Sequence, residues 1–137
     1  MHKIMHAIFI VIDDLASEPK FHRNYESISE LFTRGRHFFI QTICSSQKWK
    51  SLSTAVRGQA CWICMWSMRS ADERKAALSE FNGMYPMKVV EQFLEEATRQ
   101  RYCFLYASLR APTREHAFFK NFEYRLLPEL SAHNNAP

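Results

Sequence analysis

The sequence predicts an α/β fold, with a mostly parallel sheet flanked by helices and an antiparallel hairpin near its C-terminal end. The run Ile4–Ile12 is almost entirely apolar, which is typical of a strand buried on both faces of a parallel sheet. A segment with helical spacing and a second apolar segment follow it, as in a βαβ unit. Near the C-terminal end, two apolar segments flank Pro112 and several polar residues, which indicates a hairpin.

The first helix is expected over residues 22–34, because its apolar side chains recur on one helical face. These side chains are Tyr25, Ile28, Leu31 and Phe32. Gly35 is well placed to end this helix at its C-terminus. A second strand is then expected over His37–Cys44, and a short helix over Trp49–Val56.

The second half of the chain predicts two helices and three further strands. In chain order, they are a strand over 60–66, a helix over 70–81, a helix over 87–99, and strands over 102–109 and 117–124. Ser70 can cap the first of these helices, with Glu73 at the capping-box position. Gly83 and Pro86 separate the two helices.

The length and composition fit one globular domain or a piece of a larger protein. The chain has 137 residues, of which 47% are apolar and 14% aromatic, so a disordered chain is excluded. We expect a domain over residues 1–128 and a flexible tail over 129–137. The net charge of +4 is dispersed, which permits but does not demand contact with nucleic acid. No signal-peptide or transmembrane pattern occurs, so an intracellular, soluble protein is expected.

The cysteines and tryptophans are expected to be structural. The four cysteines, Cys44, Cys61, Cys64 and Cys103, lack disulfide-framework spacing, and we expect them to be free and buried. Cys61 and Cys64 match a redox C-x-x-C motif, but their segment is expected to be a strand rather than a helix N-terminus. The three tryptophans, Trp49, Trp62 and Trp66, are expected in the core rather than as platforms for base stacking.

Two adjacent acids, Asp13 and Asp14, follow the first strand directly. In open α/β sheets, ligands bind beyond the carboxyl ends of the strands. Gln47 follows the next strand, one βαβ unit later, so we expect all three side chains to converge on one rim of the sheet. In P-loop NTPases, a Walker B aspartate at such a position holds Mg²⁺, and a second acid can orient or deprotonate the attacking water. The alternative is that the acids only cap the turn after the strand.

Four segments together resemble the genome-packaging ATPases of large DNA viruses, the poxvirus and giant-virus members of the FtsK–HerA class of P-loop ATPases. The segments are IFIVIDDL at 8–15, ELFTRGRHFFIQTICSSQ at 30–47, AVRGQACWICMW at 55–66 and YCFLYASLRAPTREHAFFKNF at 102–122. The resemblance covers roughly residues 5–125. It implies a partial P-loop NTPase core of the ASCE type.

The resemblance implies particular roles for the polar residues at the strand ends. Asp13 matches the Walker B ligand, which holds Mg²⁺ through water. Asp14 matches the adjacent catalytic acid, and Gln47 matches the polar sensor on the next strand.

The resemblance also implies roles for arginines. Gly35, Arg36 and His37 match the G-R-H signature that enters the sensor strand. Arg57 matches an arginine that can reach the nucleotide of a neighbouring subunit in ring ATPases. Arg36 and Arg34 compete for that role, and both can also be simple cations at a helix C-terminus.

For the whole molecule, the resemblance implies Mg²⁺ and ATP as cofactors, and double-stranded DNA and capsid or portal components as partners. It further implies a homo-oligomeric ring without membrane association, located in the host cytoplasm or nucleus or with the virion. The sequence departs from the class in one respect, because none of its glycines precedes Lys-Ser or Lys-Thr, as the Walker A loop requires. In the class, the strand before that loop lies between two strands that are present here.

We therefore expect the chain to be the C-terminal part of such an ATPase, as a fragment, a split or truncated gene product, or a decayed homologue. Hydrolysis would then require a Walker A half. The alternative is a non-catalytic, degenerate ATPase-like domain that binds DNA or a partner.

Overall fold

A computed structural model describes residues 7–14 and 25–128, and the predicted tail over 129–137 lies outside them. The described chain forms two compact units. Unit 1 contains residues up to Ala60 together with 70–77, and unit 2 contains 61–69 together with the residues from Leu78 onward. The structure mixes helices with a small parallel sheet and an antiparallel sheet, which confirms the α/β class.

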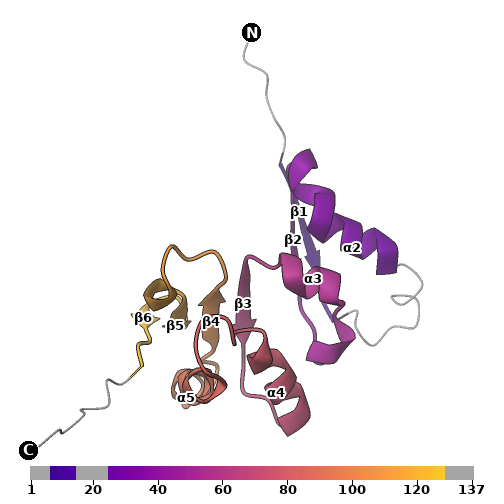
Figure 1. The fold of residues 1–137 in the computed structure, drawn as a ribbon. Helices are drawn as coiled ribbons and strands as arrows, with labels where there is room; N and C mark the ends of the chain where they lie inside the picture. Colours follow the sequence, from indigo (N-terminus) through magenta and orange to yellow (C-terminus); the bar gives the residue numbers. More distant parts are fainter. Residues whose placement is uncertain (1–6, 15–24, 129–137) are drawn as a thin grey trace, which may run out of the picture. The chain divides into compact units, whose positions relative to one another are not determined.

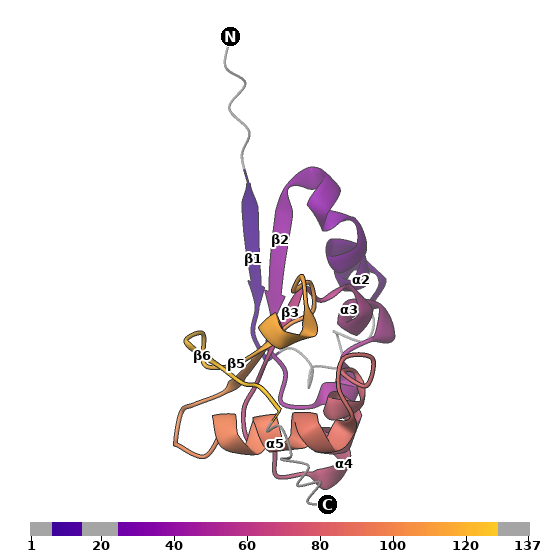
Figure 2. The same cartoon turned by 60° about the vertical axis from the view of Figure 1, so that its left-hand side comes forward.

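Unit 1 contains the predicted βαβ arrangement. Strand β1 (Ile8–Ile12) is followed by helix α2 (Tyr25–Arg34) and strand β2 (Ile40–Cys44). The two strands pair in parallel, with Ile8 opposite Ile40 and Ile12 opposite Cys44. Figure 2 shows them side by side as arrows that point the same way. The parts of the predicted strand and helix at residues 4–6 and 22–24 lie outside the described residues.

The expectation that the first strand is buried on both faces is wrong for its described part. The side chains of Ile8, Phe9 and Val11 are 52%, 60% and 64% exposed, whereas Ile12 is 7% exposed. The physical reason is that β1 packs mainly against its neighbour β2, and among the described elements no helix packs extensively on its faces. The apolar run indicates that the strand tends to be buried, but burial itself requires neighbouring elements that cover its faces.

The second strand starts later than predicted, because residues 35–38 form a 3₁₀ turn, η2 (Gly35–Phe38). Phe39 then adopts a left-handed backbone with φ of 57° before β2 begins. Gly35 directly follows the last residue of α2, as predicted. It does not have the left-handed conformation that is typical of glycine at a helix C-terminus, since no described glycine has a positive φ. Its role is close packing, since a Cβ atom at Gly35 would lie 3.3 Å from the carbonyl oxygen of Ile40.

The predicted helix over 49–56 is split into two elements, η3 (Trp49–Ser51) and α3 (Thr54–Gln59). The break occurs because Ser53 caps α3, with its hydroxyl accepting a hydrogen bond from the Val56 amide at 3.0 Å. Ser70 likewise caps α4 (Ala71–Ser79) by accepting from the Glu73 amide at 3.3 Å. The capping box is incomplete, because the Glu73 carboxylate accepts from the Lys50 amide at 3.0 Å instead.

Unit 2 is built on a four-stranded antiparallel sheet in the order β3–β4–β5–β6. Its strands are β3 (Trp62–Met65), β4 (Leu105–Ser108), β5 (Phe118–Lys120) and β6 (Tyr124–Arg125), and a 3₁₀ turn, η4 (Arg114–His116), precedes β5. The hairpin of β4 and β5 confirms the prediction near Pro112, and β6 was not predicted separately. The expectation of a mostly parallel sheet is wrong, since one strand pair is parallel and three are antiparallel in the described chain.

Helix α5 (Met87–Ala97) begins where predicted and packs against β4 and β5 (Figure 1). The side chains on one of its faces are buried. The fully or nearly buried side chains of unit 2 are Ile63, Met65, Leu78, Phe81, Tyr85, Val90, Phe93, Leu94, Ala97, Leu105, Ala107, Ala117 and Phe118. The Phe118 ring contacts those of Phe81 and Phe93 at centroid distances of 5.4 Å each, and that of Tyr85 at 5.9 Å. Phe118 is therefore the centre of this core.

Among the described residues, no helix is long and apolar enough to cross a membrane.

Candidate functional site

The parallel strands β1 and β2 bring their carboxyl ends together. Ile12 lies opposite Cys44, and the amide of Ser45 donates to the carbonyl of Ile12 at 2.8 Å. The residues that follow each strand therefore start from neighbouring positions. This backbone pairing places Asp13 and Asp14 beside the segment that follows β2.

Ser45 joins both acids. Its hydroxyl donates a hydrogen bond to Oδ1 of Asp13 and accepts one from the amide of Asp14 at 3.2 Å. Asp14 has a left-handed backbone with φ of 48°, a conformation that Asp tolerates better than most residues. The chain thus turns sharply after β1, which directs the Asp14 amide towards Ser45.

Gln47 completes the cluster, because its Nε2 atom donates to Oδ2 of Asp14 at 3.0 Å. The predicted convergence of Asp13, Asp14 and Gln47 on one rim of the sheet is confirmed. All three side chains are exposed, so a ligand can reach them from solvent. We refer to Asp13, Asp14, Ser45 and Gln47 as the rim cluster.

The sequence assigned no role to Ser45, which the structure shows to be the residue between the two acids. The available signal was the run Ser45-Ser46-Gln47 at the end of the second strand. Its polar residues could be placed at the rim, but periodicity does not tell which hydroxyl faces the acids. That choice depends on the register of β1 against β2.

The donor chemistry of the rim cluster fits Mg²⁺. Carboxylate, hydroxyl and amide oxygens are hard ligands, and Mg²⁺ is commonly held by one or two carboxylates, with water and substrate phosphates completing its shell. Within residues 7–14 and 25–128, no group of three or more His, Cys, Asp or Glu side chains could hold a metal by itself. Asp13 and Asp14 would thus need oxygen ligands from water and phosphate.

Arg57 lies on α3, where its side chain has local contacts. Its Nε donates to the Leu52 carbonyl at 3.1 Å, and its guanidinium lies 3.4 Å from the Thr54 hydroxyl and over the Trp49 ring. These contacts hold the side chain in place on unit 1. They do not bear on the expected contact with a neighbouring subunit.

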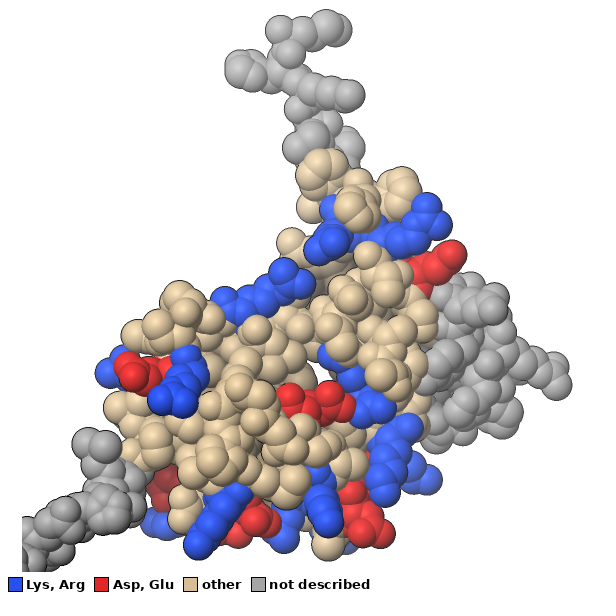
Figure 3. Space-filling model, in the orientation of Figure 1, with Lys and Arg blue, Asp and Glu red and all other residues tan. Residues whose placement is uncertain are grey.

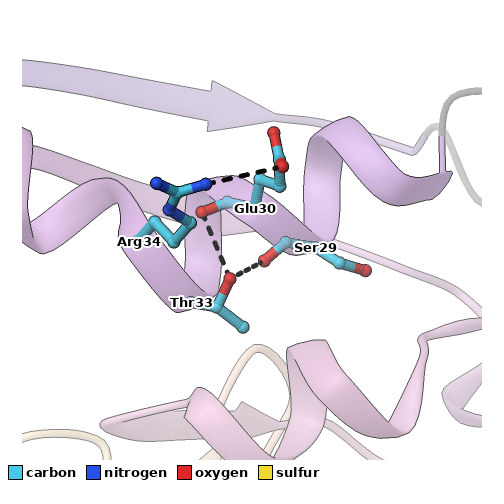
Figure 4. A network of polar contacts seen from close by, with 4 residues as sticks. All are labelled: Ser29, Glu30, Thr33 and Arg34. Atoms are coloured by element: carbon cyan, nitrogen blue, oxygen red, sulfur yellow. Dashed lines mark hydrogen bonds and ion pairs between the residues drawn. The ribbon is translucent and has the colours of Figure 1, made fainter.

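The competing arginines lie at the end of α2 and in η2. Arg34 pairs with Glu30 one helical turn earlier at 4.0 Å, and both side chains are more than two-thirds exposed (Figure 4). Such exposed pairs contribute little to stability. Figure 4 also shows the Thr33 hydroxyl donating to the Ser29 carbonyl at 2.9 Å. Arg36 and His37 are exposed in η2, whereas Gly35 is buried, and the G-R-H segment is not part of a strand.

The charged side chains show no single large basic patch on the face drawn in Figure 3. Lys and Arg are spread over that face and alternate with Asp and Glu. This distribution agrees with the dispersed charge in the sequence. Any contact with nucleic acid must therefore be argued from particular residues rather than from net charge.

All four cysteines are free, as expected, but none is fully buried. Burial raises the pKa of the Cys64 thiol to about 11 and also raises the pKa of Cys44. Cys61 is exposed at the start of the same segment. The C-x-x-C motif therefore does not contain an activated thiolate at Cys64.

Cys64 is expected to react with iodoacetamide at least about tenfold more slowly than Cys61 near pH 8, since the thiolate is the nucleophile and a raised pKa depletes it. Its rate should keep rising with pH up to about 11. Peptide mapping by mass spectrometry after timed alkylation would measure both rates. Equal labelling of the two cysteines near pH 8 would contradict this expectation.

Comparison of the chain with models of known protein families, with curated proteins and with solved structures finds no match.

Proposed function

We propose that this chain supplies the Walker B and sensor residues of an ATP-hydrolysing site, as the C-terminal part of a DNA-packaging ATPase of the FtsK–HerA class found in large DNA viruses. The observation that carries the proposal is the rim cluster, in which two acids after one strand meet a glutamine after the parallel neighbour. A phosphate-binding Walker A segment would come from elsewhere, because the 137 residues contain none.

The contacts in the rim cluster suit different roles for the two acids, Asp13 and Asp14. Ser45 fixes the carboxylate of Asp13 from one side, which leaves its second oxygen to accept from metal-bound water. Gln47 fixes Oδ2 of Asp14, and the carboxylate of Asp14 would orient or deprotonate an attacking water. The carbonyl oxygen of Gln47 can accept from the same water, because its amide nitrogen donates to Asp14.

Mg²⁺ bound through water to Asp13 would supply neutralisation of the phosphate charge that develops during transfer. The paired negative charges of Asp13 and Asp14 would also be less repulsive beside a cation. Arg57 would act on the nucleotide of a neighbouring subunit in the assembled ring. Double-stranded DNA and capsid or portal components would be the partners of that assembly.

The sheet edges are compatible with an additional strand. In the described chain, β2 is hydrogen-bonded to β1 alone, and β3 to β4 alone, so one edge of each strand is unpaired. In the proposed class, the strand that leads into the Walker A loop pairs with a neighbouring strand at such an edge. An unpaired edge is favourable for strand addition.

A second, non-catalytic function is favoured by the same contacts. Hydrogen bonds from Ser45 and Gln47 occupy one oxygen of each acid, as a structural cap for the ends of β1 and β2 would require. In that case, the chain is a degenerate ATPase-like domain that binds DNA or a partner. The two functions differ in whether Asp14 is needed for turnover of bound nucleotide.

The isolated chain is expected to show no measurable ATP hydrolysis, because it has no Gly-Lys-Ser/Thr loop to hold the phosphates. Fusing the Walker A half of a full-length packaging ATPase of this class before Met1 should restore Mg²⁺-dependent turnover. The matched control is the same fusion with its Walker A lysine replaced by alanine. Phosphate release measured for all three proteins tests the proposal.

Two results would count against it. Mg²⁺-dependent turnover by the isolated chain, abolished by Asp14→Asn, would show that no second half is needed. A fusion that binds nucleotide but hydrolyses none would favour the non-catalytic function.

A further inference from the structure

The antiparallel sheet of unit 2 has two chemically different faces. Along β3 and β4, the residues that point to one side are aliphatic and buried, and their cross-strand partners belong to the same side. This inner face includes Ile63, Met65, Leu105, Ala107 and Phe118, and α5 packs against it; Lys120 and Tyr124 share this side on β5 and β6. The opposite face contains the residues at alternate positions.

Six aromatic side chains gather on that opposite face, which we call the aromatic face. They are Trp62, Trp66, Phe104, Tyr106, Phe119 and Phe122. The expectation that Trp62 and Trp66 belong to the core is wrong, because they are 41% and 53% exposed. The reason is the register, which sends both side chains away from α5.

The rings form a continuous series across the strands. Tyr106 lies in the middle, with ring centroids 6.5 Å from Trp62, 6.1 Å from Phe119 and 5.1 Å from Phe122. Phe104 extends the series, at 5.1 Å from both Phe122 and Trp66. Most ordinary sheet faces exposed to solvent carry polar side chains, so a series of six aromatic rings requires an explanation.

The charged residues at the cross-strand positions of the sheet are both basic, with Arg125 on the aromatic face and Lys120 on the inner side. Arg125 is the direct cross-strand partner of Phe119, so it lies on the aromatic face, where it donates to Nε2 of His116 at 3.1 Å. The cross-strand positions of this face carry no acid. The acids Glu91, Glu95 and Glu96 lie on α5, which covers the inner face. Glu123, in the turn before β6, is the acid closest in sequence to Arg125.

We propose that the aromatic face binds single-stranded nucleic acid by stacking bases on its exposed rings, with Arg125 contacting the phosphate backbone. Aromatic platforms beside basic side chains are the common feature of proteins that bind single strands, since every base has a π-face. A polyanionic partner is favoured, because Arg125 is the charged residue among the cross-strand positions of this face and no acid occurs there. This proposal is independent of the ATPase role of the rim cluster.

Fluorescence anisotropy with the full chain tests the proposal. The probe is fluorescein-labelled oligothymidylate of about 15 nucleotides, comparable to the site of one small domain, with a duplex of equal length beside it. Single strand should bind more tightly than duplex. Trp62→Ala and Trp66→Ala should each weaken binding by about five- to 150-fold, as loss of one stacked base does. Arg125→Ala should reduce the salt dependence of binding.

Two controls separate stacking from loss of structure. Trp62→Phe retains a ring and should retain most of the affinity. Phe38→Ala removes an aromatic side chain that is 63% exposed on unit 1, and it should leave binding unchanged. Circular dichroism of each variant shows whether it is folded.

Three results would overturn the proposal. In the first, single strand and duplex bind equally, and the tryptophan variants bind as the wild type does. In the second, the oligonucleotide does not bind at all. In the third, sedimentation shows self-association that Trp62→Ala abolishes, which would mean that a second copy of the chain covers the aromatic face.

Discussion

Asp14→Asn in the fusion with a Walker A half is expected to lower ATP turnover by about 10²- to 10⁴-fold while leaving nucleotide affinity nearly unchanged, as loss of a general base does. The substitution keeps the shape of the side chain and an oxygen that can accept from Gln47. Asn also tolerates the left-handed backbone of Asp14, so the turn after β1 is preserved. What is lost is the carboxylate that would orient or deprotonate water.

Two further variants show whether this effect is specific. Asp13→Ala should lose both Mg²⁺-dependent nucleotide binding and turnover, because it removes the metal ligand. Gln47→Ala should spare binding and slow turnover, since it releases Oδ2 of Asp14. Binding is measured with a fluorescent ATP analogue and turnover by phosphate release. If Asp14→Asn weakened binding as much as Asp13→Ala and left turnover of bound nucleotide intact, Asp14 would be a structural cap.

Phe118→Ala is expected to destabilise unit 2 by about 3–5 kcal/mol, the usual range for removing a buried phenylalanine ring. The side chain is fully buried and contacts the rings of Phe81, Tyr85 and Phe93, which belong to α5 and the segment before it. These neighbours cannot all move inward without breaking their own contacts. A cavity therefore remains and adds to the lost transfer free energy.

Urea denaturation followed by tryptophan fluorescence measures this effect. A Trp49→Phe background leaves only Trp62 and Trp66, so the signal reports unit 2 alone. Tyr124→Ala is the matched control, because it removes a ring that is 65% exposed, and it should shift the midpoint little. A loss below about 1 kcal/mol for Phe118→Ala would contradict this core packing.

The contiguous patterns in the sequence were sufficient to predict whether most elements are helices or strands. The apolar run before Asp13, the helical spacing before Gly35 and the apolar run before Ser45 predict a βαβ unit, and the parallel pairing of β1 and β2 confirms it. The convergence of the rim cluster follows from that unit, because parallel strands end at the same side. The capping serine Ser70 was also correct, since a cap acts on the next few residues.

The predicted ends of the helices and strands were less accurate, because short-range contacts at an end compete with the side-chain pattern used for the prediction. The predicted strands over 60–66, 102–109 and 117–124 are shorter in the structure, and the helices over 70–81 and 87–99 end at Ser79 and Ala97. At Phe39, a left-handed residue delays β2 until Ile40. These limits depend on individual backbone conformations rather than on periodicity.

By itself, the sequence determined the order and type of most elements and the polar residues at the ends of β1 and β2. The tertiary structure alone decided that Ser45 lies between the two acids, that β3 pairs antiparallel with β4, that β1 is exposed, and that Trp62 and Trp66 face away from the core. The physical reason is that register and burial are set by neighbours distant in the chain. A residue's own side chain fixes only its preference for those neighbours.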